Sequence, residues 1–453
     1  MIFERKIMNK LEEWKKYSDG SKAVLIEGAR RIGKSTVAEE FAKKHYKSYI
    51  IIDFAFASDN IKDAFRHHLL NLDDFFMIIS SEYNTPLYKR QSVIIFDEIQ
   101  LFPKAREAIK LLVKDRRYDY IETGSLISIK ENVKEILIPS EEHPIKMYPM
   151  DFEEFCLAMG DNQIIGYIRE CFTQKKPLLE AIHKKASFLF MQYILIGGMP
   201  KVVSSFIESG KQFEMCSFEK NDILNLYRND INKIDDRYKA KVLSIFDGLP
   251  GFLSSHEKRV KINSFDETNR AVSYEESFFW LADSMICNEC FLCNDPNVGL
   301  SLNENKSFIK CYMGDTGLLV THSFDENAIA EQNIYSKILT GHLSINKGML
   351  FENVIAQMLT ANGHKLYFYT CYNKEKHRND IEIDFLLSNK DKTNLKIYPI
   401  EVKSSKKYTT VSLERFIDKY HDRIGCAYII HPQNLTAPHD KLLCIPPYMT
   451  ICL

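Results

Sequence analysis

The sequence lacks an excess of charge of either sign. Its 453 residues contain 60 Lys and Arg against 61 Asp and Glu, which gives a formal net charge of −1. A protein that binds nucleic acid through its overall charge is usually strongly basic, so the composition argues against that class. Any binding of DNA or RNA would have to depend on a local basic patch.

Long apolar runs are also missing. No stretch approaches the roughly 20 apolar residues that a membrane-spanning helix needs. The N-terminal residues MIFERKIMNKLEEWKK contain no hydrophobic signal-peptide core. We therefore expect a cytoplasmic protein without a membrane partner. A hydrophobic content of 45% is sufficient for a sizeable core, and the length suggests about two to four domains.

The eleven cysteines are expected to be reduced thiols in the cytoplasm. Cys287, Cys290 and Cys293 form a C-x-x-C-x-x-C pattern, with Cys311 further on, which is compatible with a metal or cluster site. However, Trp280–Cys290 is typical of a helix that leads into a strand, which would separate the thiols. The sequence therefore favours the alternative, in which these cysteines are small core residues.

The stretch Val24–Thr36, VLIEGARRIGKST, is typical of a phosphate-binding loop. An apolar run that predicts a buried strand precedes Gly28, and a predicted helix begins after Gly33. The intervening residues fit G-x-x-x-x-G-K-[ST] at every fixed position. Such a loop presents backbone N–H groups and a helix N-terminus to a polyphosphate. The residues expected to contact the nucleotide are Gly28, Ala29, Arg30, Arg31, Ile32, Gly33, Lys34, Ser35 and Thr36.

Specific roles in ATP hydrolysis follow for residues at two strand ends. Lys34 is expected to bind the β- and γ-phosphates of ATP, and the Ser35 hydroxyl to ligate Mg²⁺. Val93–Phe96 predicts a strand that ends at Asp97 and Glu98, which is the Walker B pattern. We expect Asp97 to hold Mg²⁺ and Glu98 to polarise the attacking water. Without a phosphate-binding loop, the same pattern would equally describe a strand end with solvated acids.

Alternating strands and helices predict a parallel α/β sheet with its ligand at the carboxyl ends of the strands. Tyr118–Ser125 is one such strand, and Thr123 and Ser125 at its tip are candidates to sense the γ-phosphate. Helical patterns over Gly166–Gly210 predict a lid beside the nucleotide. Helices and strand–turn–strand signals over 221–325 predict a winged-helix-like domain, which serves either DNA binding or protein interaction.

A second candidate site lies beyond a polar linker at 326–343. Two apolar strands are predicted over Glu382–Ser388 and Ile397–Lys403. They carry Asp384, Glu401 and Lys403, and the last two point to the same face because strand side chains alternate. Two carboxylates can share Mg²⁺ while a lysine stabilises or deprotonates the attacking water, which is the chemistry of phosphodiester hydrolysis.

The predicted helix Lys347–Asn362 carries Glu352 near its start, which is a candidate third acid of this site. A surface strand pair with a cross-strand salt bridge is the alternative interpretation. Burial favours the site, because unpaired charge is costly in apolar strands. We therefore expect Asp384 and Glu401 to be metal ligands. The basic run Lys403–Lys407 either contacts phosphates or is a solvated turn.

Over nearly its whole length the chain resembles prokaryotic AAA-type ATPases that carry a C-terminal domain related to PD-(D/E)XK restriction endonucleases. The motifs that carry the resemblance are GARRIGKS at Gly28–Ser35, VIIFDEIQ at Val93–Gln100, TGS at Thr123–Ser125, MYPMDFEEF at Met147–Phe155, GGMP at Gly197–Pro200, DTGLL at Asp315–Leu319, FEN at Phe351–Asn353, EIDFLL at Glu382–Leu387 and PIEVKSS at Pro399–Ser405.

The resemblance implies a multidomain α/β protein. It places a P-loop ATPase core with a parallel sheet at residues 1–160, a helical lid at 161–220, a winged-helix-like domain at 221–325 and a restriction-endonuclease-like α/β domain at 343–453. Two features depart from the family pattern. No proline precedes Asp384, and the segment after the sensor strand is acidic where related ATPases often have an arginine. Candidates to replace that arginine are Arg116, Arg117, Arg228 and Arg237.

Two functions remain open at this point. The leading hypothesis is an Mg²⁺-dependent ATPase whose cycle drives or gates a nuclease-like domain that acts on DNA or RNA. The alternative is a nucleotide-dependent switch that recruits a protein or nucleic-acid partner without cleaving it. A homo-oligomer is compatible with both.

Overall fold

The structure is a computed structural model. It describes residues 1–125, 139–255, 260–261, 271–297, 299–324, 335, 347–373, 375, 377–388, 396–405 and 408–453. The predicted linker at 326–343 and residues 406–407 of the basic run lie almost entirely outside these ranges. The chain divides into two compact units, Met1–Tyr148 with Asp283–Met285, and Pro149–Ala282 with Ile286–Leu453.

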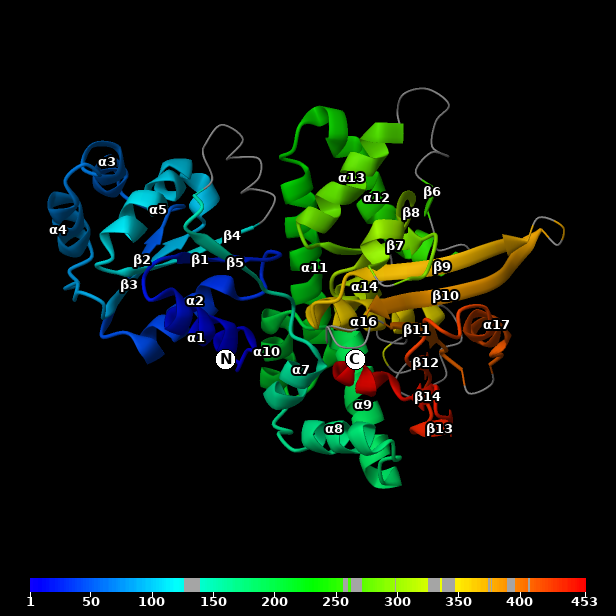
Figure 1. Ribbon diagram of the computed structural model, residues 1–453. Helices are drawn as coiled ribbons and strands as arrows, with labels where there is room; N and C mark the ends of the chain where they lie inside the picture. Colours follow the sequence, from blue (N-terminus) through cyan, green and yellow to red (C-terminus); the bar gives the residue numbers. More distant parts are fainter. Residues whose placement is uncertain are drawn as a thin grey trace. The chain divides into compact units, whose positions relative to one another are not determined.

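The first unit alternates strands and helices, coloured blue to cyan in Figure 1. Its elements are α1 (Ile7–Ser18), β1 (Ala23–Glu27), α2 (Lys34–His45), β2 (Ser48–Asp53), α3 (Asp59–His67), α4 (Leu72–Glu82), β3 (Ser92–Asp97), η1 (Ile99–Leu101), α5 (Pro103–Asp115), β4 (Asp119–Gly124) and β5 (Glu142–Lys146).

The five strands form one parallel sheet in the order β2-β3-β4-β1-β5. β3 and β4 are buried along their whole length, as apolar strands covered on both faces must be. A cluster of aromatic rings, including Phe54, Phe65 and Phe96, packs this sheet against α3, α4 and α5. The prediction of a parallel P-loop core is confirmed. Because β4 lies between β1 and β3, residues at its tip reach both predicted halves of the nucleotide site.

The second unit begins with helices and continues into a mixed sheet. Its helices are α7 (Phe152–Ala158), α8 (Ile164–Gln174), α9 (Glu180–Ile196), α10 (Pro200–Glu208), α11 (Phe213–Ile231), α12 (Asp236–Ser254), α13 (Ala271–Asp283), η3 (Leu300–Asn303), α14 (Thr316–His322), α16 (Lys347–Ala361), α17 (Val411–Lys419) and η4 (Pro447–Cys452). Its strands are β6 (Val260–Lys261), β7 (Cys287–Cys293), β8 (Glu304–Met313), β9 (Leu366–Asn373), β10 (Arg378–Ser388), β11 (Ile397–Val402), β12 (Ala427–Ile430), β13 (Thr436–His439) and β14 (Leu442–Ile445).

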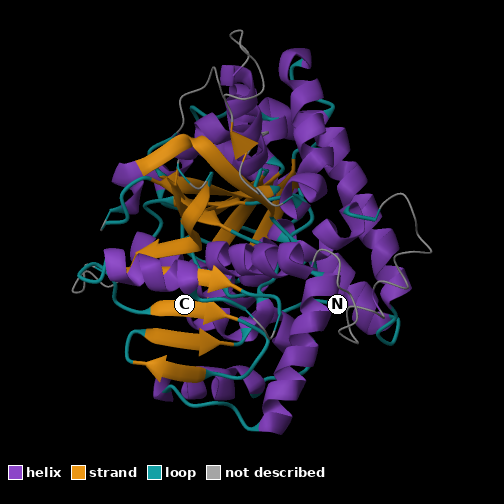
Figure 2. Cartoon of the chain, turned by 90° about the vertical axis from the view of Figure 1, so that its right-hand side faces the viewer, coloured by secondary structure: helices purple, strands orange, loops and turns teal. Residues whose placement is uncertain are grey.

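These nine strands form one sheet in the order β13-β14-β12-β11-β10-β9-β7-β8-β6. β10 pairs antiparallel with both β9 and β11, and Figure 1 shows β9 and β10 as a long hairpin. α16 packs against β7, β8, β9 and β11, while α17 packs against β10. Figure 2 shows the strands of this sheet with helices packed around them. The sheet therefore brings residues from α16, β8, β10 and β11 close to one another.

This sheet differs from the predicted division of the chain. β7 and β8 are the strand–turn–strand that the sequence predicts, but β7 also pairs in parallel with β9. The strands expected in a separate winged-helix-like domain thus continue the sheet of the expected nuclease-like domain, because their apolar edge is completed by β9. The winged-helix prediction is not supported. The remaining boundaries stay predictions.

The helices predicted as a lid, α8 to α10, belong to the second unit. α9 packs against α14, α16 and η4, and its apolar residues from Leu189 to Ile196 are largely buried. Their role as a nucleotide lid stays a prediction. Within the described ranges, no single helix is long and apolar enough to cross a membrane, and α9 with α10 reaches that threshold only as a pair bent by 117°.

Candidate functional site

The phosphate-binding loop joins β1 to α2 in the first unit. Gly33 has a φ of +93° and lies at the N-terminus of α2, a conformation that glycine adopts without strain. A Cβ atom on Gly28 would lie 2.5 Å from the carbonyl oxygen of Met147, so that position also requires glycine. Of the remaining loop residues, Ala29 and Ile32 are buried, whereas Arg30, Arg31 and Thr36 are partly or fully exposed.

Lys34 points into the loop that precedes it. Its Nζ donates hydrogen bonds to the carbonyl oxygens of Gly28 at 3.0 Å and Ala29 at 2.9 Å. Burial lowers the pKa of Lys34 to about 8, although Glu98 and Asp97 oppose this effect. The side chain therefore keeps its charge at neutral pH. It is an ammonium group in a buried loop that a phosphate would neutralise.

Asp97 ends β3 and accepts two hydroxyl hydrogen bonds on one oxygen. Ser35 Oγ donates to Asp97 Oδ1 over 2.8 Å, and Thr123 Oγ1 at the end of β4 donates to the same atom. The carboxyl ends of β1, β3 and β4 thus bring three predicted site residues together. Ser125 follows β4 directly and is partly buried. The hydroxyl and carboxylate oxygens of Ser35 and Asp97 are of the kind that Mg²⁺ prefers, so this donor set fits the ion.

Glu98 has a backbone conformation that is uncommon for a residue other than glycine. Its φ is +52°, in the left-handed region, between β3 and η1. Its carboxylate accepts a hydrogen bond from Nε2 of Gln100. Positive φ values at such residues cost free energy and are frequent where a side chain must be aimed at a site. The geometry is consistent with the predicted water-polarising role of Glu98.

Arg5 supports the phosphate-binding loop, although sequence reasoning did not identify it. The side chain is 6% exposed. Its Nη1 donates to the carbonyl oxygen of Ile32 at 2.9 Å, and its Nη2 to that of Tyr148 at 2.7 Å. Arg5 therefore ties the loop to a segment 143 residues away in the sequence.

β4 itself carries a buried carboxyl group. Glu122 is fully buried, and neither of its carboxylate oxygens has a hydrogen-bond partner among the residues described. Burial, together with nearby Glu142, raises the pKa of Glu122 well above its usual value, which favours the neutral form of this carboxyl group. Arg106 on α5 donates to both oxygens of Glu142, at 2.8 and 2.7 Å. Sequence reasoning did not find this group.

The arginine candidates are partly engaged elsewhere. Arg117 forms ion pairs with Asp73 at 2.5 Å and Asp115 at 2.6 Å, and Arg228 pairs with Asp247 at 3.1 Å. Arg116 ends α5 with a φ of +57°, and the side chain of Arg237 lies outside the described part of the structure. An arginine that completes the nucleotide site from a neighbouring subunit stays a prediction.

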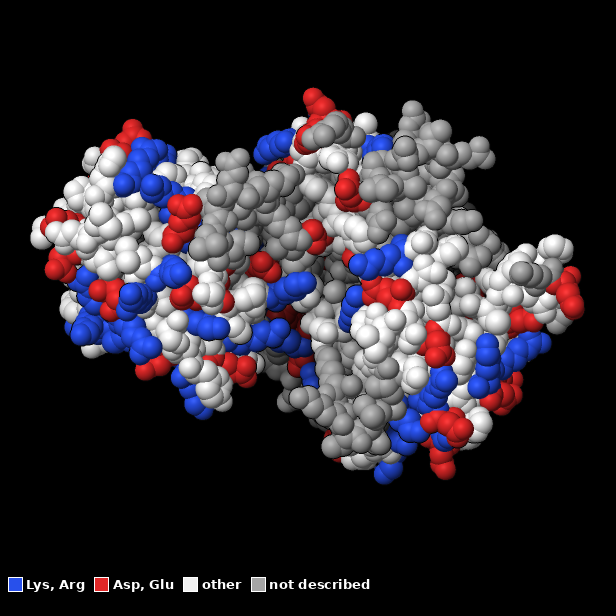
Figure 3. All heavy atoms as spheres, turned by 45° about the horizontal axis from the view of Figure 1, so that its top comes forward, with Lys and Arg blue, Asp and Glu red and all other residues white. Residues whose placement is uncertain are grey.

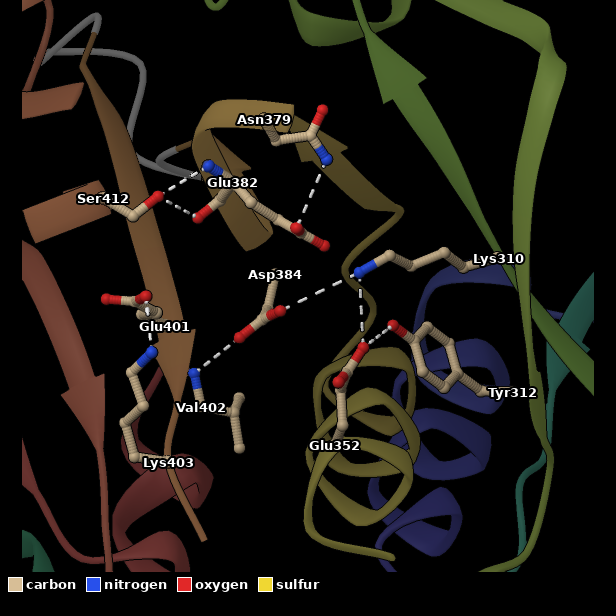
Figure 4. A network of polar contacts seen from close by, with 10 residues as sticks. All are labelled: Lys310, Tyr312, Glu352, Asn379, Glu382, Asp384, Glu401, Val402, Lys403 and Ser412. Carbon is tan, nitrogen blue, oxygen red and sulfur yellow. Dashed lines mark hydrogen bonds and ion pairs between the residues drawn. The ribbon is translucent and has the colours of Figure 1, made fainter. Parts of the chain in front are cut away.

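The second candidate site lies in the second unit (Figure 4). Phe385 on β10 pairs with Ile400 on β11, so Asp384 and Glu401 are on neighbouring strands. Oδ2 of Asp384 accepts the backbone N–H of Val402 at 2.8 Å. Lys403, directly after β11, lies with its Nζ 2.6 Å from Oε1 of Glu401. The structure thus brings the three residues predicted from β10 and β11 together.

Glu401 is buried, with the second carboxylate oxygen lacking a described hydrogen-bond partner. Burial raises the pKa of Glu401 to about 7, and Lys403 opposes this shift. A carboxyl group with this pKa carries a proton in a large share of molecules at neutral pH.

Glu352 on α16 does not join the pair of acids directly. Its Oε1 accepts a hydrogen bond from Tyr312 OH at 2.5 Å and lies 3.4 Å from Nζ of Lys310. The same Nζ lies 3.8 Å from Oδ1 of Asp384. Lys310 was not predicted from sequence, because β8 was assigned to another domain. Among the described residues, no group of three His, Cys, Asp or Glu side chains is placed to hold a metal ion.

The thiols of the C-x-x-C-x-x-C stretch lie in β7, and Cys311 lies in β8. All four are free and buried. Burial raises the pKa of Cys290 and Cys293 above the usual value for a thiol. High thiol pKa values disfavour the thiolate form that binds metals.

Three of the motifs that carry the family resemblance form one buried polar cluster. Asp315 accepts the N–H groups of Gly198 at 2.6 Å and Leu318 at 3.0 Å. Gln357 accepts the N–H of Thr316 at 2.8 Å, and Asn353 accepts the N–H of Met313 at 2.8 Å. GGMP, DTGLL and FEN thus join α9, α14 and α16, which is a structural rather than a chemical role.

Comparisons with known families divide the chain into three parts. Residues 20–156 match a family described as an AAA domain. Residues 187–328 and 347–449 match two families described as domains of unknown function, DUF8612 and DUF4143. The chain therefore carries an AAA-type ATPase domain, which implies binding of ATP with Mg²⁺, followed by two domains of unknown function. A relation to nucleases is not shown.

Several solved structures are similar at low identity. They include the Walker-type ATPase PABY2304 of Pyrococcus abyssi (14% identity, TM-score 0.40, 71% of this chain and 96% of that chain). AMPPCP-bound DnaA from Aquifex aeolicus is another (9%, 0.29, 75% and 95%). A third is the RuvB Holliday junction branch migration motor of Thermotoga maritima (12%, 0.28, 63% and 89%). No significant match is found among curated proteins.

Proposed function

We propose that this chain is an Mg²⁺-dependent ATPase that acts as a nucleotide-dependent switch, with the second unit as its output. The observation that carries the proposal is the convergence of Ser35 and Thr123 on one oxygen of Asp97, next to the buried ammonium of Lys34. These residue types at the carboxyl edge of a parallel sheet fit binding and hydrolysis of a nucleoside triphosphate.

Each residue contributes a distinct step in this proposal. Lys34 exchanges its two carbonyl partners for phosphate oxygens, and the loop N–H groups orient the same phosphates. Ser35 and Asp97 would hold Mg²⁺, which neutralises charge on the phosphates when bound. Glu98 accepts a proton from the attacking water, and Thr123 links the metal-binding carboxylate to β4.

The test is Lys34→Ala, with nucleotide binding followed by calorimetry and phosphate release followed separately. Both are expected to be lost, because the loop then lacks the buried ammonium of Lys34 that would contact the phosphates. Lys44→Ala is the matched control, since Lys44 lies on the same helix but is exposed and paired with Glu12 at 3.1 Å. Undiminished ATP hydrolysis in Lys34→Ala would contradict the assignment of this loop as the site of hydrolysis.

The nuclease hypothesis remains the second candidate. The neighbouring positions of Asp384 and Glu401, with Lys403 close to Glu401, support it. The position of Lys310 against Glu352 and Asp384 weakens it, because the third acid is already paired. Surface charge gives no clear preference, since basic and acidic side chains are interspersed on the face shown in Figure 3.

The two candidates differ in one assay. The purified chain is incubated with plasmid, single-stranded DNA and RNA, in Mg²⁺ or Mn²⁺, with and without ATP. Cleavage that is lost in Asp384→Ala would establish a nuclease, and loss of its ATP dependence in Lys34→Ala would show that ATP gates it. We expect ATP binding without cleavage, which directs the search to a protein or nucleic-acid partner.

A further inference from the structure

One buried ammonium group lies among the acids of the C-terminal site. The side chain of Lys310 is 2% exposed, and that of Glu352 is 4% exposed. Nζ of Lys310 lies 3.4 Å from Glu352 Oε1 and 3.8 Å from Asp384 Oδ1 (Figure 4). The same nitrogen lies over the ring of Phe368, 5.1 Å from the ring centroid. Lys310 therefore sits between the helix acid and the strand acid.

The two carboxylates have further donors. Tyr312 OH donates to Oε1 of Glu352 at 2.5 Å, and the N–H of Val402 donates to Oδ2 of Asp384 at 2.8 Å. The ammonium, the phenol and the backbone amide together provide partners for the buried carboxylate of Glu352 and the partly buried carboxylate of Asp384.

A divalent ion would have to compete with this arrangement. Mg²⁺ requires carboxylate oxygens at about 2.0–2.1 Å in near-octahedral geometry. An ion placed between Glu352 and Asp384 would meet the ammonium of Lys310, which is buried and cannot turn into solvent. Repulsion between the two cations would be strong at this low exposure. Glu352, the candidate third acid, therefore does not fit as a metal ligand together with Asp384.

We propose that Lys310 is the resident cation of this site, where its ammonium takes the place of a divalent metal ion and ties β8 to α16 and β10. The negative charge of Glu352 and Asp384 in the second unit is then neutralised by a lysine of the same unit. This inference deepens the switch hypothesis, but it does not depend on ATP hydrolysis. It also means that Asp384 has a structural role, so a loss of function in Asp384→Ala needs a test of folding.

The experiment measures Mn²⁺ binding by electron paramagnetic resonance in the full-length chain without nucleotide. The Asp97→Asn substitution is included in every sample to remove the P-loop metal ligand. In the Asp97→Asn parent, we expect no Mn²⁺ binding that the Asp384→Asn substitution would remove. We expect Lys310→Ala to gain one Mn²⁺ site, with affinity at least about tenfold higher than in the parent, and Asp384→Asn to abolish the gain.

Lys220→Met is the matched control. Lys220 is also fully buried, but its Nζ donates to the carbonyl oxygen of Leu195 at 3.0 Å and to Tyr335 OH at 2.8 Å. It should gain no Mn²⁺ site. The proposal is overturned if the Asp97→Asn parent binds Mn²⁺ and Asp384→Asn removes it, or if folded Lys310→Ala binds no more Mn²⁺ than the parent.

Removal of the ammonium could also prevent folding, because the buried carboxylate of Glu352 and the partly buried one of Asp384 would lose their counterion. Lys310→Met with Glu352→Gln removes one charge of each sign and is expected to fold, as judged by circular dichroism. If Lys310→Ala does not fold, Mn²⁺ binding by the Asp97→Asn parent decides whether the site holds a divalent ion. Because no sample contains nucleotide, a failure of this proposal is separate from a failure of the ATPase assignment, which Lys34→Ala tests.

Discussion

At the scale of single residues, two ionisable side chains of the first unit are buried, and the sequence pattern identifies neither of them. Arg5 links the phosphate-binding loop to Tyr148, and Glu122 lies next to Thr123 in β4 without a hydrogen-bond partner among the residues described. A buried arginine that satisfies two carbonyl oxygens fixes backbone geometry, whereas a buried acid without partners opposes folding. The two residues therefore lead to predictions of opposite sign.

Arg5→Ala is expected to weaken nucleotide binding by about tenfold and to destabilise the first unit by roughly 1.5–3 kcal/mol, because hydrogen bonds from a charged donor are lost. Calorimetry with a non-hydrolysable ATP analogue measures the affinity. Arg5→Lys should recover part of it, since one carbonyl oxygen can still be reached. Arg66→Ala, at an exposed ion pair with Asp63, is the control. Unchanged affinity in a folded Arg5→Ala protein would contradict a positioning role.

Glu122→Gln is expected to stabilise the protein, and the gain should grow with pH. The folded-state pKa of Glu122 is raised, so above its unfolded value near 4.5 the unfolded chain ionises while the folded chain stays protonated. The wild type then loses up to about 1.4 kcal/mol of stability per pH unit until the folded-state pKa is reached. Glutamine removes this loss.

Thermal unfolding between pH 5 and 8, taken as roughly the range of maximal stability, measures the effect. Glu142→Gln is the control, because Glu142 accepts two hydrogen bonds from Arg106 and its loss should destabilise the protein. A difference between Glu122→Gln and wild type that does not change with pH would show that Glu122 ionises in the folded state.

At the scale of elements, the close approach of α14 to the end of α9 organises the second unit. A Cβ atom on Gly317 would lie 2.2 Å from the carbonyl oxygen of Ile196. We expect Gly317→Ala to lower stability by roughly 1–3 kcal/mol or to prevent folding, because the backbones must separate. Gly166 in α8 has nothing within 4 Å of such a Cβ, so Gly166→Ala should be neutral or stabilising. Equal melting temperatures for both variants would refute this account of the contact.

Elements that are coded by local patterns could be predicted, and contacts between distant elements could not. The strand and helix around Gly28–Ser35 and the acids after β3 follow from periodicity and spacing. Lys310 and Glu352 are 42 residues apart, and their meeting depends on the pairing of β7 with β9. No local signal in β8 specifies that pairing. The winged-helix interpretation failed for the same reason, since a strand–turn–strand signal does not say which strand joins its edge.

At the scale of the whole molecule, a switch requires that nucleotide binding change the second unit. A partner that prefers one state of that unit would, by reciprocity, change nucleotide affinity by the same factor. We therefore expect a non-hydrolysable ATP analogue to alter amide hydrogen exchange in α16 or β10, as well as around the phosphate-binding loop. Exchange is the suitable measurement because it reports local opening in each element separately.

The variants already described show whether a change in hydrogen exchange in the second unit depends on nucleotide binding. Lys34→Ala should abolish the change in both units, because the nucleotide no longer binds, whereas Lys44→Ala should retain it. Lys310→Met with Glu352→Gln should bind nucleotide normally but show a different response in α16, since the ion pair between Lys310 on β8 and Glu352 on α16 is gone. If the analogue alters exchange only within residues 20–125 of the wild type, the two units are not coupled by nucleotide. The second unit would then act independently of the ATPase cycle, and the switch hypothesis would fail while the ATPase assignment stands.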